Sequence, residues 1–277
     1  MLPLKHIALT LSIVSGLLSG VAEAGGKTAG PGNKTAEMFT SAQEARIGEV
    51  VKDYLLAHPE VLVDVSRKLQ VQQQERQLQA MTAAVIQNQA SLLNDKGTPS
   101  YGPAKAKVAL IEFFDYQCVV CARQAPVIES VMKANPGVRF VFKAWPIFAQ
   151  RWINSQKAAQ ESLEIWKSAG AEAWLAYHNG IFATGHNEGT LDAADISRVA
   201  TMALRGRQMK DGTIDTISIL DNNNVLARML GFQGTPALIV MPVSGASSKN
   251  VTVIPGGADQ SMLQAAIARA SIVNAQV

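Results

Sequence analysis

The chain contains only two cysteines, Cys118 and Cys121, and two residues separate them. An apolar run over 108–114 predicts a buried strand before them, and the pattern over 122–134 predicts a helix after them. Cys118 is therefore expected where a helix begins, and unpaired N–H groups and the helix dipole favour a thiolate there. A thiolate is the attacking form in disulfide exchange. The pattern predicts that Cys118 is the exposed nucleophile and that Cys121, one turn later and deeper, resolves the mixed disulfide.

Three other interpretations of the cysteine pair compete with redox chemistry. A structural disulfide across so short a loop stabilises a fold by only about 2 kcal/mol. A zinc site needs a second pair of ligands, and neither His178 nor His186 stands at ligand spacing to the cysteines. Inert buried thiols are the third interpretation. The strand, motif and helix together favour a redox-active disulfide between Cys118 and Cys121, with no metal.

Glu112 is the second residue with chemical potential, because it stands inside the apolar run 108–114. Burial disfavours the charged form of a carboxyl group and raises its pKa. Such a group can relay a proton to or from Cys121. The alternative is a glutamate near the strand end whose side chain reaches solvent.

The third feature is Thr235-Pro236, which precedes the predicted strand 237–241. Proline cannot donate to a sheet ladder, so its place before a buried strand needs a reason. A cis Thr235–Pro236 bond in a tight turn supplies one, and it leaves the Thr235 backbone free to pair with an extended substrate. An ordinary trans turn is the alternative.

The pattern between and after these residues alternates strands and helices. The order is β-α-β, then a mainly helical region over 152–230, then β-β-α. The further strands are expected at 139–145 and 251–254, and the closing helix at 261–273. We expect an α/β domain over 107–277 with a helical insert at about 150–231.

The N-terminal residues 1–24 resemble a secretory signal peptide, with a short basic start and Ala22-Glu23-Ala24 as a small-x-small cleavage site. The apolar stretch of about 12 residues is too short to span a bilayer. Export places the cysteines where disulfides form and persist. The composition, 48% hydrophobic with a net charge of +3, fits a globular protein and gives no reason to expect a nucleic-acid partner.

A flexible leader is expected over 25–43, a helical segment over 44–95 and a linker over 96–106. Within the helical segment, residues 70–79 are nearly all polar and rich in glutamine. A solitary polar helix is marginal in water. We therefore predict that 44–95 associates with copies of itself; the alternative is a surface helix folded back on the domain.

Together these features resemble the thioredoxin fold: a glutamate six residues before the first cysteine, Cys-x-x-Cys at a helix start, and Thr-Pro before a strand. The helical insert resembles that of the DsbA family. Three further segments carry the likeness, which covers about 44–273: Phe113-Phe114-Asp115-Tyr116, Trp145-Pro146-Ile147 and the run 54–62. The last resembles the N-terminal region of the oligomeric ScsC/BcfH-like subgroup.

The resemblance implies a periplasmic thiol–disulfide oxidoreductase that needs no cofactor. It implies clients that are unfolded or misdisulfided secreted proteins, a membrane redox partner, and a dimer or trimer with disulfide isomerase activity. The alternatives are a dithiol oxidase, a copper-handling protein that binds metal through the two thiols, and a chaperone-like oligomer. The implied site consists of Cys118 as nucleophile, Cys121 as resolving thiol, Glu112 as proton relay, and Thr235, Pro236 and Tyr116 in the substrate groove.

The sequence departs from the family at Val119-Val120, between the cysteines. Members more often carry residues such as Pro-His or Pro-Tyr there. Two valines offer neither a hydrogen bond nor a positive charge to the thiolate. We therefore predict that Cys118 is less acidic, and its disulfide less oxidising, than in DsbA.

Overall fold

The computed structural model describes residues 39–95, 97–207 and 214–272. The predicted signal peptide and the leader as far as residue 38 lie outside these residues. Among the helices described, none combines the length and the apolar character that crossing a bilayer requires. The chain divides after Val63 into two compact units.

The first unit contains α1 (Ser41–Ala57) and the start of α2 (Glu60–Gln87). Helix α1 begins inside the predicted leader, because Thr40 and Gln43 form a capping box. The Gln43 N–H donates to Thr40 Oγ1 at 3.3 Å, and the Thr40 N–H donates to Gln43 Oε1 at 2.8 Å. The helix ends at His58, directly before Pro59.

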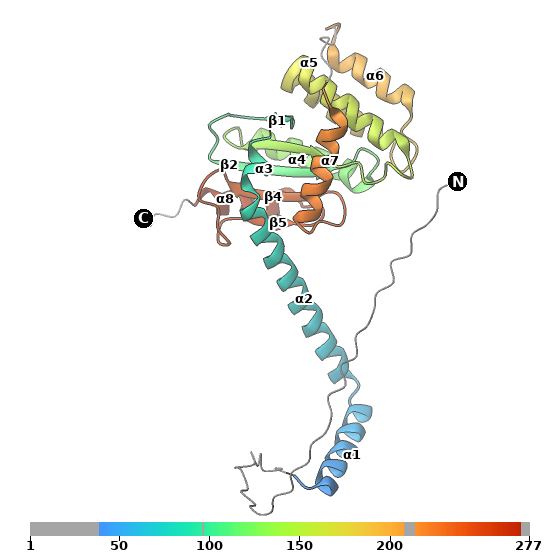
Figure 1. Ribbon diagram of the computed structural model, residues 1–277, viewed down its shortest axis with the longest axis vertical. Coiled ribbons are helices and arrows are strands. Elements are labelled where there is room, and N and C mark those ends of the chain that lie inside the picture. The colour runs from blue at the N-terminus through green and yellow to red at the C-terminus, as the bar shows by residue number, and fades with distance from the viewer. Residues whose placement is uncertain (1–38, 96, 208–213, 273–277) are drawn as a thin grey trace, which may run out of the picture. The chain divides into compact units, whose positions relative to one another are not determined.

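The second unit is built on a five-stranded sheet in the order β1-β3-β2-β4-β5 (Figure 1). The strands are β1 (Ser100–Tyr101), β2 (Val108–Phe114), β3 (Arg139–Ala144), β4 (Ala237–Pro242) and β5 (Thr252–Ile254). Central β2 pairs parallel with β3 and antiparallel with β4, while β5 and β1 form the antiparallel edges. Apart from β1, the element order agrees with the sequence pattern.

Helices cover both faces of this sheet. They are α3 (Gln89–Leu93), α4 (Val119–Ala134), α5 (Ile153–Ala183), α7 (Thr216–Met229) and α8 (Gln260–Ser271), together with the end of α2, while α6 (Ala193–Leu204) packs on α5. Side chains alternate along β2, so Leu110 and Phe114 pack in the core that α4, α5 and α8 share. Ile111 and Phe113 point the other way, into a core with α7, α3 and the end of α2.

The core on the second face of the sheet, the face of Ile111 and Phe113, includes the end of the segment 44–95 that we predicted to self-associate. Met81 and Val85 on α2 and Leu92 and Leu93 on α3 are buried against the sheet. Because every residue of β2 is buried, both faces need an apolar cover. The residues from Met81 onward therefore belong to the catalytic unit, and only the preceding part of the segment is left for self-association.

The predicted linker 96–106 also joins the sheet. Ser100 and Tyr101 form strand β1 and pair with β3. The buried Lys143 ammonium lies 3.2 Å from Asp95 Oδ2, 3.0 Å from Thr98 Oγ1 and 3.4 Å from Asn223 Oδ1. A strand of two residues is too short to produce an alternating pattern, so the sequence did not reveal it.

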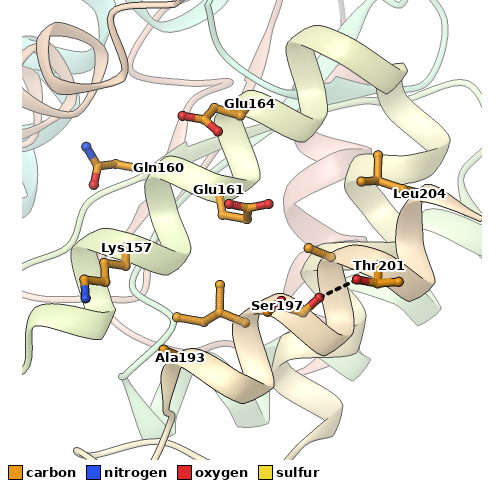
Figure 2. A pocket seen from close by; sticks show the side chains of 10 residues that line it. Lys157, Gln160, Glu161, Glu164, Ala193, Ser197, Thr201 and Leu204 are labelled. Atoms are coloured by element: carbon orange, nitrogen blue, oxygen red, sulfur yellow. Dashed lines mark hydrogen bonds between the residues drawn. The ribbon is translucent and has the colours of Figure 1, made fainter. Parts of the chain in front are cut away.

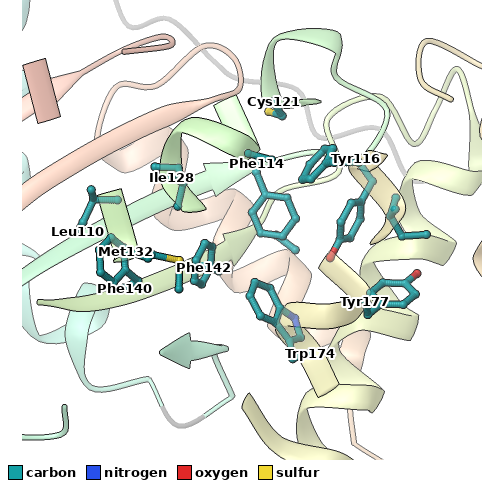
Figure 3. Close-up of a cluster of buried hydrophobic side chains, with 14 of the residues drawn as sticks. Leu110, Phe114, Tyr116, Cys121, Ile128, Met132, Phe140, Phe142, Trp174 and Tyr177 are labelled. Atoms are coloured by element: carbon teal, nitrogen blue, oxygen red, sulfur yellow. The ribbon is translucent and has the colours of Figure 1, made fainter. Parts of the chain in front are cut away.

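The core on the first face contains a dense aromatic cluster that joins β2 to the insert helix α5. Figure 3 shows Phe114, Phe142 and Trp174 facing one another, with Tyr116 and Tyr177 beside them. Buried His178 stacks on Trp174 with ring centroids 4.6 Å apart. Burial lowers the pKa of His178 to about 3, so the imidazole is neutral.

Helices α5 and α6 of the insert enclose a surface groove of their own (Figure 2). Its walls carry Glu161 and Glu164 from α5 and Ser197 and Thr201 from α6. Burial, and then the neighbouring charge of Glu164, raise the pKa of Glu161. Neither cysteine lines this groove.

Candidate active site

Cys118 is the N-cap residue of α4 and directly follows the turn that leaves β2. Its backbone is extended, with φ −85° and ψ 116°, and its N–H donates to the Asp115 carbonyl at 3.1 Å. The sulfur therefore lies at the positive end of the helix dipole. This is the position that the sequence pattern predicts for the nucleophile.

The Cys118 side chain is more covered than expected. Cys118 exposes 5% of its surface and Cys121 none. The Thr235 backbone lies against the Cys118 sulfur, and the thiol donates to the Thr235 carbonyl at 3.2 Å. Cys121 is the deeper of the two, as predicted, but Cys118 is not freely exposed. The structure contains both cysteines as free thiols, so their disulfide stays a prediction.

The two thiols have pKa values shifted in opposite directions. The neighbouring Cys121 thiol, against the effect of burial, lowers the pKa of Cys118 to about 6, with smaller contributions from Thr235 and the N–H groups of Cys121 and Val120. Burial, and then the closeness of Cys118 and Glu112, raise the pKa of Cys121 well above that of an ordinary thiol. At neutral pH, Cys118 is mainly the attacking thiolate and Cys121 keeps its proton.

Glu112 lies in the middle of β2, between Phe142 of β3 and Leu238 of β4. It exposes 1% of its surface, so the alternative of a solvent-reaching glutamate is wrong. Its Oε2 atom has no hydrogen-bond partner among the described residues. Burial, and then the charge of the Cys118 thiolate, raise its pKa to about 8. A carboxyl group with this pKa beside Cys121 suits the exchange of a proton at neutral pH.

Thr235 and Pro236 precede a different strand from the one that leads to the cysteines, and the Thr235 backbone contacts the Cys118 side chain. Their peptide bond is cis, as predicted. They immediately precede β4, the antiparallel neighbour of β2, which brings the Thr235 carbonyl to Cys118. The structure thus brings Thr235 to the site formed by Glu112, Cys118 and Cys121, although Thr235 lies 117 residues after Cys118 in the chain.

The expectation that Tyr116 lines the substrate groove is wrong. Tyr116 exposes 1% of its surface, and its hydroxyl lies 3.3 Å from Nδ1 of His178. The side chain packs in the aromatic cluster under the redox turn (Figure 3). Its ring contacts Phe114, Tyr177 and Phe182, so the side chain belongs to the interior.

Sequence reasoning missed two buried polar residues of the redox turn, Asp115 and Gln117. The Asp115 carboxylate accepts from the N–H groups of Gln117 at 2.8 Å and Phe148 at 2.9 Å, and from the Ser155 hydroxyl at 2.8 Å. Gln117 binds the loop between α5 and α6. The available signal was a pair of polar residues between an apolar strand and a cysteine.

A metal site with several protein ligands is not evident in the described ranges. No three histidine, cysteine, aspartate or glutamate side chains converge there. The chemistry that the described site supports is thiol–disulfide exchange by the two thiols, with Glu112 as proton acceptor and donor.

Replacing Glu112 with glutamine is expected to slow resolution of a mixed disulfide by Cys121 at least about tenfold, because the buried thiol loses its proton acceptor. Stopped-flow release of a peptide from Cys118 measures this step.

The Glu112→Gln variant is also expected to lose a pH dependence of its free energy of unfolding. The folded pKa of Glu112 is raised to about 8, so the wild type loses stability as pH rises from about 4 through 8.

The matched control is Glu172→Gln, on the exposed surface of α5. It should change neither the resolution rate nor the pH dependence of urea unfolding. Equal resolution rates for Glu112→Gln and the wild type across pH 6–9 would show that Glu112 does not relay the proton.

Two family profiles match the chain. The profile described as the copper resistance protein ScsC N-terminal domain matches residues 43–76. The profile described as thioredoxin matches residues 94–245, more than half of the chain. No curated protein matches the chain.

Solved structures show the same relationship. BcfH from Salmonella enterica Typhimurium is 41% identical, with 83% of this chain and 96% of that chain covered and a TM-score of 0.73. A linker-deletion variant of Proteus mirabilis ScsC is 28% identical, with 84% and 97% covered and a TM-score of 0.58. The thiol-disulfide exchange protein α-DsbA2 from Wolbachia pipientis, 22% identical, shares the fold, with 70% and 97% covered and a TM-score of 0.57.

These matches confirm the expected thioredoxin fold with a helical insert and a preceding helical segment. They also agree with the thiol chemistry that the geometry supports. The chain belongs to the thioredoxin-fold thiol–disulfide oxidoreductases, in the DsbA-like group that includes ScsC and BcfH.

Proposed function

We propose that this protein is a periplasmic, homo-oligomeric disulfide isomerase that acts on misdisulfided secreted proteins. The observation that carries the proposal is a series of exposed apolar side chains on α1 and α2, in a chain that also holds a reactive thiol pair. The series comprises Ile47, Val50, Val51, Tyr54, Leu56, Leu62, Val63, Val65, Leu69, Val71 and Leu78. Solvated apolar series of this extent are typical of protein interfaces.

The reaction begins when the Cys118 thiolate attacks one sulfur of a client disulfide. The client S–S bond breaks, a Cys118–client disulfide forms, and the second client sulfur leaves as a thiolate. In isomerisation another client thiolate then attacks the mixed disulfide, so a new client disulfide forms and Cys118 is released. If Cys121 attacks instead, Glu112 accepts its proton, the client is released reduced, and Cys118–Cys121 becomes the disulfide.

Assembly supports isomerisation through multivalency. A client that is held by one thiolate meets the thiolates of the other subunits at a high effective concentration. Residues 44–80 suit this role, because they contain the exposed series and precede the buried Met81. The signal-peptide pattern of residues 1–24 supports periplasmic delivery, where a membrane redox partner sets the state of the cysteines.

Copper handling is the second candidate, and the match of residues 43–76 to a copper resistance protein's domain favours it. Two adjacent thiols are suitable soft ligands for Cu(I). Competition with a Cu(I)-specific chromophoric chelator tests this function. If it is correct, the wild type should withdraw one Cu(I) per site and Cys118→Ser should not. An inability of the wild type to withdraw Cu(I) would contradict it.

Deleting residues 25–72 is expected to give a monomer by light scattering and to reduce reactivation of scrambled ribonuclease at least about fivefold, because multivalent capture is lost. The deletion removes α1 and most of the exposed series but retains Met81 and Val85, so the catalytic unit keeps its core. Reduction of glutathione disulfide should stay within twofold of the wild type.

Point variants provide the matched control. Val51→Glu should weaken assembly, while Lys52→Glu, at the neighbouring exposed position, should not. If the truncated protein oxidises reduced ribonuclease as fast as the full chain, and the full chain does not reactivate scrambled ribonuclease, the protein is a dithiol oxidase.

The Val119-Val120 pair leads to a prediction about redox potential. Equilibration with glutathione should give a potential below the roughly −120 mV of DsbA. The pKa of Cys118, about 6, also lies above the DsbA value of about 3.5, and a less stable thiolate makes a weaker oxidant. Val120→His should raise the potential by supplying a positive charge, whereas Val120→Leu should not. A wild-type potential equal to that of DsbA would refute the prediction.

A further inference from the structure

Gln117, the residue before the nucleophile, is completely buried and is bound to the loop between α5 and α6. Its Oε1 atom accepts from the Gly189 N–H at 2.8 Å, and its Nε2 atom donates to the Leu191 carbonyl at 3.4 Å. Its own carbonyl accepts from the Glu188 N–H at 2.9 Å. Three hydrogen bonds therefore join this loop to the backbone that leads into Cys118.

Residues at the start of α5 contact the other side of the same loop. Gly189 has a φ of 99°, and a Cβ atom there would lie only 2.6 Å from Nε1 of Trp152. The Asn154 side chain donates to the Leu191 carbonyl at 2.9 Å. The loop is thus packed between Trp152 and the redox turn, and its close approach to Trp152 requires a glycine.

Other side chains of this loop remain open to solvent. His186, Glu188 and Thr190 are exposed, although the loop is bonded to the residue adjacent to Cys118. An exposed, anchored segment beside a thiolate borders the path by which a bulky substrate approaches. A small disulfide can reach the sulfur without contacting such a border, whereas a polypeptide disulfide brings flanking chain against it.

We propose that Gln117 is a positioning residue that fixes the α5–α6 loop as one wall of the site for polypeptide disulfides. This inference rests on the proposed action on protein clients. Gln117 does not touch the reacting sulfur atoms of the substrate; it acts through the loop. Losing its side-chain amide leaves the Gly189 N–H without its partner, so the loop shifts and polypeptide binding weakens.

The kinetic test compares Gln117→Met with the wild type. The methionine side chain has a similar length to that of glutamine, but it is apolar and makes neither hydrogen bond. KM for scrambled ribonuclease should rise about five- to tenfold with kcat within twofold. The rate with glutathione disulfide and the Cys118 titration midpoint should stay unchanged. Gln150→Met, at an exposed position, is the control and should match the wild type.

A glycine pair tests the loop without altering Gln117. Gly189→Ala forces the loop away from Trp152, whereas Gly185→Ala, also at positive φ, adds a methyl group into open space. Only Gly189→Ala should reproduce the rise in KM for scrambled ribonuclease. This pair keeps the test available if Gln117→Met does not fold.

Direct contact is tested by photo-crosslinking. In a Cys121→Ser background that holds scrambled ribonuclease on Cys118, a benzophenone amino acid in place of Thr190 should crosslink to ribonuclease. The same probe in place of Thr201, in the groove of Figure 2, should not. Equal crosslinking at both positions, or unchanged KM in Gln117→Met and Gly189→Ala, overturns the inference. A wild type active only on glutathione disulfide would instead contradict the proposed function.

Discussion

Every residue of strand β2 is buried, and both the fold and the chemistry depend on this burial. A strand covered on both faces must be apolar and must recruit helices to each side. On one side these are α4, α5 and α8; on the other they are α7, α3 and the end of α2. The same burial raises the pKa of Glu112, which lies in the middle of that strand. Its Oε2 atom has no hydrogen-bond partner among the described residues.

The two thiols of the redox centre lie close together but have pKa values shifted in opposite directions. Cys118 caps the N-terminus of α4, where N–H groups and the Cys121 thiol stabilise a negative charge. Cys121 lies one turn deeper, where burial and the nearby negative groups oppose the same charge. The attacking and resolving roles therefore follow from depth along one helix turn. Glu112, with its pKa raised to about 8, can exchange a proton with the deeper thiol.

The helical insert is part of this centre as well as of the core. Asp115 and Gln117 flank Tyr116, and all three side chains bind or pack against insert residues rather than solvent. The turn that carries Cys118 is consequently held by groups that lie 33 to 74 residues further along the chain. The insert therefore fixes the backbone of the turn from which the Cys118 helix begins.

From the sequence alone we predicted the order of the strands and helices other than β1, the cysteine pair at a helix start, the burial of Glu112 and the cis bond at Pro236. Each follows from local features: apolar periodicity, a helix terminus, a polar residue in an apolar run, or a proline before a strand. The three-dimensional arrangement was needed to show that Tyr116 is interior, that the residues from Met81 to Leu93 cover the sheet, and that Gln117 holds the α5–α6 loop. These depend on which distant segments meet, and short polar stretches and two-residue strands have no periodicity that records their partners.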